Sequence, residues 1–210
     1  IKKLGELKEI EFDNIFIDGT KIEASANRYT FVWKKSIAKN EANLQDKIKE
    51  IFLKINQNLH LCFIIDNSII SVDDATSLKN ILYSIVDNNK LEFVYGKGRR
   101  KSKLQKYIEE LDKFIEKQSY YNNCNDIFNG RNSFSKTDHD ATFMHMKEDH
   151  MKNGQLKPAY NIQIGVEGEY IVGVDVSNER SDQLTFIPFL DKLEKNLSKK
   201  YNSVTADAGY

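Results

Sequence analysis

The spacing of the apolar residues changes twice along the chain. Between about residues 38 and 118, apolar side chains recur at steps of three and four residues, which indicates amphipathic helices. Before and after this stretch they alternate with polar residues or form short runs, which indicates strands. We therefore predict an α/β core formed by residues 1–36 and 131–210 and interrupted by an α-helical insertion over residues 37–130.

The central stretch contains three helical patterns. The first runs from Leu44 to Leu59, the second follows Asp73-Asp74, which are helix start signals, and the third runs from Leu104 to Ile115. The run from Leu61 to Ile70 fits a strand or a helix. A small helical bundle or a coiled-coil hairpin explains this part of the chain without any further function.

The segments on either side resemble the strands of a sheet. Residues 15–24 predict one strand, either continuous or bent at Asp18-Gly19, because Asp-Gly is a strong hairpin signal. Residues 160–166 alternate between apolar and polar or small side chains, Glu167-Gly168-Glu169 forms a turn, and YIVGVDV follows. This order predicts a β-hairpin.

The last part of the chain predicts a helix and a short strand. Ser181 or Asp182 can cap the helix, but Pro188 is tolerated only in a first turn, so Thr185 is an alternative cap. The strand ends at Asp207. The hairpin makes the sheet mixed, and the helix permits a crossover to a parallel partner strand. We expect residues 120–140 to be a polar connector.

Two aspartates occupy corresponding places, each where an apolar strand meets small residues. Asp18 precedes Gly19, and Asp207 precedes Ala208-Gly209. If the two strands are parallel neighbours, their carboxylates lie side by side and require a cation. Mg²⁺ prefers oxygen ligands, and metal pairs support in-line phosphoryl transfer. On spacing alone, an aspartate at such a place is more often a turn former or a helix cap.

Charge gives only local evidence for nucleic acid. Lys+Arg and Asp+Glu are equal at 31 each, so no global basic excess exists. Six basic residues within 97–106 favour phosphate contacts by Arg99, Arg100 and Lys101, or form a solvated loop. Shortly after Asp18 come three basic residues, which we consider for DNA contacts, and one aromatic residue, which we consider for base stacking or core packing. These residues are Arg28, Trp33, Lys34 and Lys35.

Other features argue against competing classes of protein. Cys62 and Cys124 form no CxxC pair, which argues against a disulfide scaffold or a zinc site and fits a reducing cytosol. No apolar run reaches the roughly 18 residues of a membrane span. Metal-ligating residue types cluster without regular spacing, and we favour a turn that satisfies backbone groups. They are Asp138, His139, Asp140, His145 and His150.

Four blocks of sequence, in this order, resemble a known family. They are FIDGTKIEASANRYTFVWKKS, SFSKTDHDATFMHMKEDH, KPAYNIQIGVEGEYIVGVDVSNERSDQLTFIPFLDKL and VTADAGY. They are similar to bacterial insertion-sequence transposases of the DDE type, in the branch whose catalytic core is interrupted by a helical segment after its first strand. The resemblance covers nearly the whole chain and is strongest at residues 15–36 and 133–210.

The resemblance implies a ribonuclease H-like core with the first catalytic aspartate on the first strand and the second at the end of the fourth. Asp18 and Asp207 match these positions as ligands of Mg²⁺ or Mn²⁺. The third acid, usually a Glu in a motif with Tyr, Arg and Lys, is expected beyond Tyr210. We therefore expect a chain truncated at its C-terminus, without the family's N-terminal DNA-binding segment, that binds metal weakly and is inactive alone.

The partners implied are the DNA of transposon terminal repeats and target DNA, bound by a homodimer in a bacterial cytoplasm at the nucleoid. Three alternatives remain open at this point. The chain fits a nuclease of the same fold, or a non-catalytic DNA-binding or assembly remnant of a decayed transposase. A bundle-forming interaction protein is the third, and it leaves Asp18 and Asp207 unexplained.

Overall fold

The structure, a computed structural model, describes residues 1–61, 63, 69–146 and 154–210. The chain divides into two units, each with its own internal contacts. We call residues 1–33 with 130–210 the sheet unit and residues 34–129 the helical unit. The helical unit thus begins at residue 34 rather than at residue 37.

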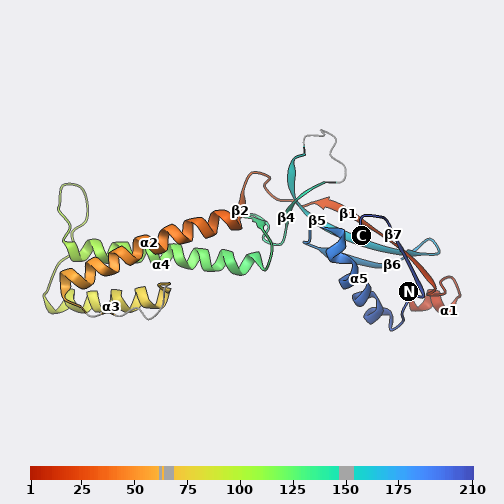
Figure 1. The fold of residues 1–210 in the computed structure, drawn as a ribbon, viewed down its shortest axis with the longest axis horizontal. Coiled ribbons are helices and arrows are strands. Elements are labelled where there is room, and N and C mark those ends of the chain that lie inside the picture. Colours follow the sequence, from red (N-terminus) through yellow and green to blue (C-terminus); the bar gives the residue numbers. More distant parts are fainter. Residues whose placement is uncertain (62, 64–68, 147–153) are drawn as a thin grey trace. The chain divides into compact units, whose positions relative to one another are not determined.

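The sheet unit contains a mixed sheet with the strand order β4-β5-β1-β7, in which β6 also pairs with β5 (Figure 1). Strand β7 is parallel to β1, whereas β5 is antiparallel to β1, β4 and β6. The predicted mixed sheet is therefore confirmed. The elements are α1 (Lys2–Glu6), β1 (Asn14–Glu23), β4 (Thr142–His145), β5 (Leu156–Glu167), β6 (Tyr170–Ser177), α5 (Asp182–Leu197) and β7 (Ser203–Ala206).

The hairpin between β5 and β6 turns through two residues. Gly168 and Glu169 have φ angles of 54° and 71°. Positive φ at both central positions is the geometry of tight hairpin turns that match the twist of the strands. The predicted β-hairpin and its turn are confirmed.

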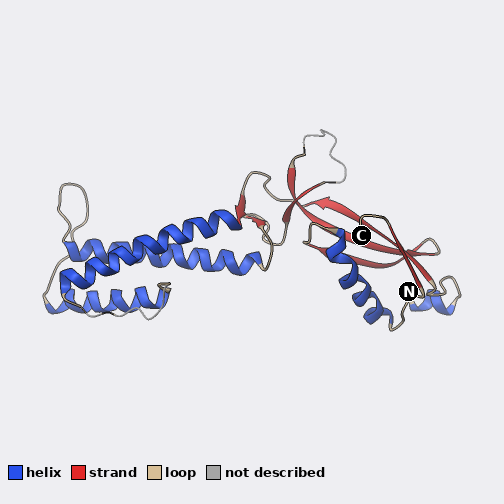
Figure 2. Ribbon diagram, in the orientation of Figure 1, coloured by secondary structure: helices blue, strands red, loops and turns tan. Residues whose placement is uncertain are grey.

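Helix α5 covers one face of the sheet (Figure 2). Its buried side chains Phe189 and Leu193 pack over a pair of glycines, Gly165 on β5 and Gly173 on β6, which are partners in the ladder. A Cβ atom at Gly173 would lie 2.4 Å from Leu193 Cδ1, so the close packing of helix on sheet requires a residue without a side chain.

Helix α5 does not begin at Thr185, the alternative cap. Ser181 is the N-cap, and Thr185 lies within the helix, where its hydroxyl donates to the carbonyl of Asp182. Pro188 is inside the helix and exposed. The hydrogen bond that Pro188 cannot donate is therefore lost on the solvent side, where water can satisfy the opposite carbonyl.

Strand β5 buries its polar side rather than its apolar side. Asn161 and Gln163 are both 0% exposed under α5, whereas Ile162 and Ile164 on the other face are partly exposed. In the described part of the chain, that other face is an apolar surface open to solvent. Its exposed large side chains include Phe16, Ile22, Val174 and Val176.

A buried glutamate fixes the segment before β1. Glu167 accepts hydrogen bonds from the backbone N–H groups of residues 11–13, and its second oxygen accepts from the Tyr201 hydroxyl at 2.9 Å. Burial first, and then the nearby carboxylate, raise the pKa of Tyr201 above its ordinary value. This cluster joins the N-terminal segment to the entry of β7 and has a structural role.

A small second sheet lies where the chain leaves and re-enters the sheet unit. Strands β2 (Phe31–Trp33) and β3 (Ser133–Ser135) are antiparallel, and Trp33 pairs with Ser133. Because β2 precedes the helical unit in sequence and β3 follows it, this pairing brings the two ends of the insertion together. Such an arrangement allows a unit to be inserted into a sheet fold.

The helical unit consists of three long helices in the described residues: α2 (Lys34–Leu59), α3 (Val72–Asn88) and α4 (Lys103–Phe128). Ser71 caps α3 in a reciprocal capping box with Asp74. Helix α4 extends through residues 120–128, so the predicted connector is wrong there. Cys124 and Phe128 are buried, and Asn129, with φ 40°, ends the helix.

Two buried glutamines hold the loops of the helical unit. The Gln45 amide pairs with both backbone groups of Ile70, and the Gln105 amide pairs with both backbone groups of Val94. Each amide therefore forms with one loop residue the two hydrogen bonds that a neighbouring strand would form in a sheet. Most of the ambiguous run from Leu61 to Ile70 lies outside the described residues.

None of the helices in the described part of the chain has both the length and the apolar character that crossing a membrane requires.

Candidate metal site on two neighbouring strands

Asp18 lies within a continuous strand. Strand β1 pairs with β5 without interruption from Phe16 to Glu23, and the glycine that follows Asp18 has no positive φ. The hairpin and bend alternatives for Asp18-Gly19 are therefore wrong. Asp18 is exposed on the same face of β1 as Phe16 and Thr20, which is the face opposite α5.

Asp207 lies beside Asp18. The parallel register pairs Ile17 with Ala206, and the next residue along each strand is Asp18 and Asp207 respectively. Both side chains line one cavity of about 480 Å³, together with apolar residues of β1 and β5. The structure thus brings together two carboxylates that are far apart in the sequence.

The Asp207 side chain is oriented by its own turn. Its Oδ1 atom accepts a hydrogen bond from the backbone N–H of Gly209 at 2.6 Å, and its carbonyl accepts from the N–H of Tyr210 at 3.4 Å. A side-chain oxygen that accepts from the backbone two residues ahead is a local turn motif. The other carboxylate oxygen has no role in this turn.

A buried polar network packs against Gly19. Gln163 pairs with Gly19 across the strands, and its amide nitrogen donates to Asn161 at 3.0 Å and to Asp182 at 3.4 Å. The Tyr210 hydroxyl donates to the Gln163 carbonyl oxygen. A Cβ atom on Gly19 would lie 2.6 Å from Gln163 Nε2 and 2.9 Å from Tyr210 Oη, so a side chain at this position would displace both groups.

These network residues were missed by reasoning from the sequence. The alternation over residues 160–166 identified the strand but did not show that its polar side is the buried one. Tyr210 is also close to the carboxylates. Burial raises the pKa of Tyr210 to about 12, and the charges of Asp182, Asp18 and Asp207 contribute in that order. The phenol is therefore protonated at neutral pH and available as a donor.

The donor set of the pair suits a hard divalent cation. Asp18 and Asp207 offer carboxylate oxygens, and Mg²⁺ binds through one or two carboxylates while it keeps several waters. Among the described residues, no group of three or more His, Cys, Asp or Glu side chains is arranged to hold a metal ion. Within the described residues, the pair alone therefore offers two carboxylates and no third acidic, His or Cys side chain arranged with them to hold a metal ion.

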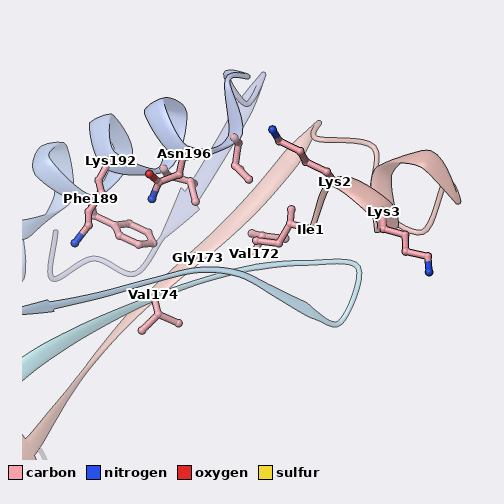
Figure 3. A pocket seen from close by; sticks show the side chains of 11 residues that line it. Ile1, Lys2, Lys3, Val172, Gly173, Val174, Phe189, Lys192 and Asn196 are labelled. Carbon is pink, nitrogen blue, oxygen red and sulfur yellow. The ribbon is translucent and has the colours of Figure 1, made fainter.

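A second and larger cavity in the sheet unit has different chemistry. It measures about 530 Å³ and lies between α5, β6 and the N-terminal residues (Figure 3). Its lining is apolar with lysines at Lys2, Lys3 and Lys192, and Lys192 pairs with Asp175. No acidic side chain lines this cavity, so it does not suit a cation.

Arg28 and Trp33, which were considered for DNA contacts near Asp18, both have partners within the sheet unit. The Arg28 Nε atom lies 2.8 Å from Glu23 Oε1, and Lys157 binds the other oxygen of Glu23 at 3.0 Å. These two cations, with Lys157 first, lower the pKa of Glu23. Trp33 packs against Phe31 and Phe143, which favours the core-packing reading for its ring.

The remaining basic candidates belong to the helical unit. Lys34 and Lys35 are exposed in the first turn of α2. Arg99 and Arg100 are exposed in the loop between α3 and α4, whereas Lys101 binds Glu109 at 2.7 Å. Arg99 and Arg100 are therefore better placed for phosphate contacts than Lys101.

The Asp138–Asp140 turn has a structural explanation. Asp138 accepts from the backbone N–H groups of Asp140 and Ala141 and from the Tyr160 hydroxyl at 2.8 Å. Its carboxylate thus satisfies backbone groups, as the sequence suggested. His150, from the same predicted cluster, and Cys62 lie outside the described residues.

Comparisons of this chain with family models, with curated proteins and with solved structures gave no match.

Proposed function

We propose that this chain is part of a DDE-type DNA transposase with a ribonuclease H-like core. The observation that supports it best is the juxtaposition of Asp18 and Asp207 at neighbouring positions of parallel strands, beside one cavity. If β1, β5, β6 and β7 are counted as the first four strands of the core, Asp18 is on the first and Asp207 follows the fourth. The motif resemblance implies this same placement.

In this proposal Asp18 and Asp207 hold Mg²⁺ or Mn²⁺. A bound metal pair activates the attacking oxygen and stabilises the leaving oxygen of a phosphodiester. The residues of this chain supply the geometry. The pairing of β1 with β7 up to Ala206 would bring the two carboxylates together, and the turn at Gly209 holds one oxygen of Asp207.

The DNA contacts and the assembly follow from the same proposal. Arg99 and Arg100 would bind phosphates of a transposon end, with a salt dependence that reflects the release of counterions. Lys34 and Lys35 are further candidates for phosphate contacts. Two transposon ends would be joined in a homodimer before strand transfer to target DNA.

The test uses the polypeptide that the intact gene encodes, with labelled transposon-end DNA and Mg²⁺ or Mn²⁺. Asp18→Asn and Asp207→Asn should lower cleavage by orders of magnitude and leave DNA binding unchanged, because only the metal ligands are lost. Asp191→Asn, an exposed carboxylate on α5, is the matched control and should cut normally. Normal cleavage by either site variant would refute the assignment.

The assay also separates the alternatives. A nuclease of the same fold cleaves the DNA but does not join the freed 3′ end to target DNA. A non-catalytic remnant binds the transposon end and cuts it with neither metal. Joined products that depend on Asp18 and Asp207 would therefore distinguish the transposase from both.

A further inference from the structure

The centre of the buried polar network is Gln163. This side chain is 0% exposed, and each of its polar atoms has a partner on a different element. Its nitrogen donates to Asp182 at the first turn of α5 and to Asn161 on its own strand. Its oxygen accepts from Tyr210, three residues after Asp207. One buried side chain thus joins α5 to the segment that follows β7.

The segment that follows β7 is held at both ends. At one end β7 pairs with β1 as far as Ala206. At the other end the Tyr210 ring packs 5.3 Å from the Phe186 ring, and its hydroxyl reaches Gln163. Asp207 lies between these two attachments. Its position relative to Asp18 therefore depends on both of them.

A purely apolar interior would stabilise this part of the fold at least as well. Buried amides and hydroxyls cost free energy unless each is paired, and they add directional constraints that apolar side chains do not provide. Gln163 pairs across the strands with Gly19, which follows Asp18 directly. The network therefore contacts the backbone next to one carboxylate and anchors the segment of the other.

We propose that Tyr210 and Gln163 act as positioning residues, whose hydrogen bond keeps Asp207 beside Asp18 in the geometry that binds a divalent cation. This inference rests on the proposed function, because it needs the two carboxylates to be metal ligands. Groups that orient metal ligands typically contribute about tenfold to a hundredfold in metal affinity. Loss of the Tyr210 hydroxyl should weaken metal binding although no ligand is changed.

The experiment measures Mn²⁺ binding to residues 1–210 from the electron paramagnetic resonance signal of free Mn²⁺. Tyr210→Phe removes one hydroxyl, and Asp18→Asn and Asp207→Asn mark the loss of a ligand. Tyr201→Phe is the matched control, because it removes a buried hydroxyl bonded to Glu167 in the same unit. Thermal unfolding of every variant separates loss of fold from loss of affinity.

The inference predicts that Tyr210→Phe lowers Mn²⁺ affinity by about tenfold. Tyr201→Phe should keep wild-type affinity even if its melting temperature falls. Unchanged affinity in Tyr210→Phe, with binding lost in the aspartate variants, would overturn the positioning role and leave the metal site intact. Equal affinity in wild type and both aspartate variants, or no binding by any of them, would refute the metal site and the positioning role together.

Discussion

The two units of this protein use buried amides in different ways. In the helical unit, Gln45 and Gln105 each pair with both backbone groups of one loop residue and so fix a loop, whereas the buried amide of Gln118 pairs with side chains of α2 and α4. In the sheet unit, Asn161 and Gln163 pair mainly with side chains, including Asp182 and Tyr210. The two glutamines bonded to backbone therefore fix the path of a loop, whereas the two amides of the sheet unit join side chains from segments that are distant in the sequence.

The largest expected loss of stability comes from a substitution in the apolar core of the helical unit. Phe52 is 1% exposed, so Phe52→Ala should destabilise that unit by about 3–5 kcal/mol. Its neighbour Leu53 is 61% exposed, and Leu53→Ala should change stability by less than about 0.5 kcal/mol. Hydrogen exchange should show faster opening in residues 34–129 for the first variant only. Equal effects of the two variants would contradict the core assignment.

A smaller change in the sheet unit tests its side-chain network. Gly19→Ala places a methyl group against Gln163 and Tyr210, and overpacking of this kind costs about 1–3 kcal/mol. Chemical denaturation should detect the loss, and exchange should increase around β1 and β5 but not in the helical unit. If Gly19→Ala unfolds like wild type, the network does not pack against β1 as described.

The role of Gln105 in fixing its loop can be tested in the same way. Gln105→Leu leaves both backbone groups of Val94 without their partner, which costs about 1–3 kcal/mol where these groups cannot reach water. Because Val94 is only partly buried, we expect a value near the lower limit. Exchange of the Val94 amide should accelerate while the sheet unit is unaffected. Unchanged protection at Val94 would show that the amide does not hold this loop.

Alkaline pH gives the mildest test. Burial raises the pKa of Tyr160 and of Tyr210 to about 12, with a further contribution from Asp138 for Tyr160 and from Asp182, Asp18 and Asp207 for Tyr210. The folded state holds these protons more tightly, so their contribution is complete below pH 10 and is lost as the pH rises through about 12. A Tyr160→Phe/Tyr210→Phe variant should show a shallower loss of stability in this range. An unchanged slope would contradict the shifts.

Within each unit, the sequence predicted the helices and strands better than the contacts between those helices and strands. Regular apolar spacing revealed the helices, but the polar residues after Gln118 hid the last turns of α4. The strand with Asp18 was recognised, whereas the inward side of β5 was not, because Asn161 and Gln163 are buried only in the context of α5. Local patterns report periodicity, and a polar interior depends on partners from distant segments.

The most direct test of the metal site follows the backbone amides of residues 1–210 by NMR during a titration with Mn²⁺. If Asp18 and Asp207 bind the ion together, as proposed, paramagnetic broadening should appear first at residues 17–19 and 205–209. Asp18→Asn should abolish this selective broadening. Broadening that centres on the Asp138–Asp140 turn instead, or that is the same with Asp18→Asn, would contradict the assignment.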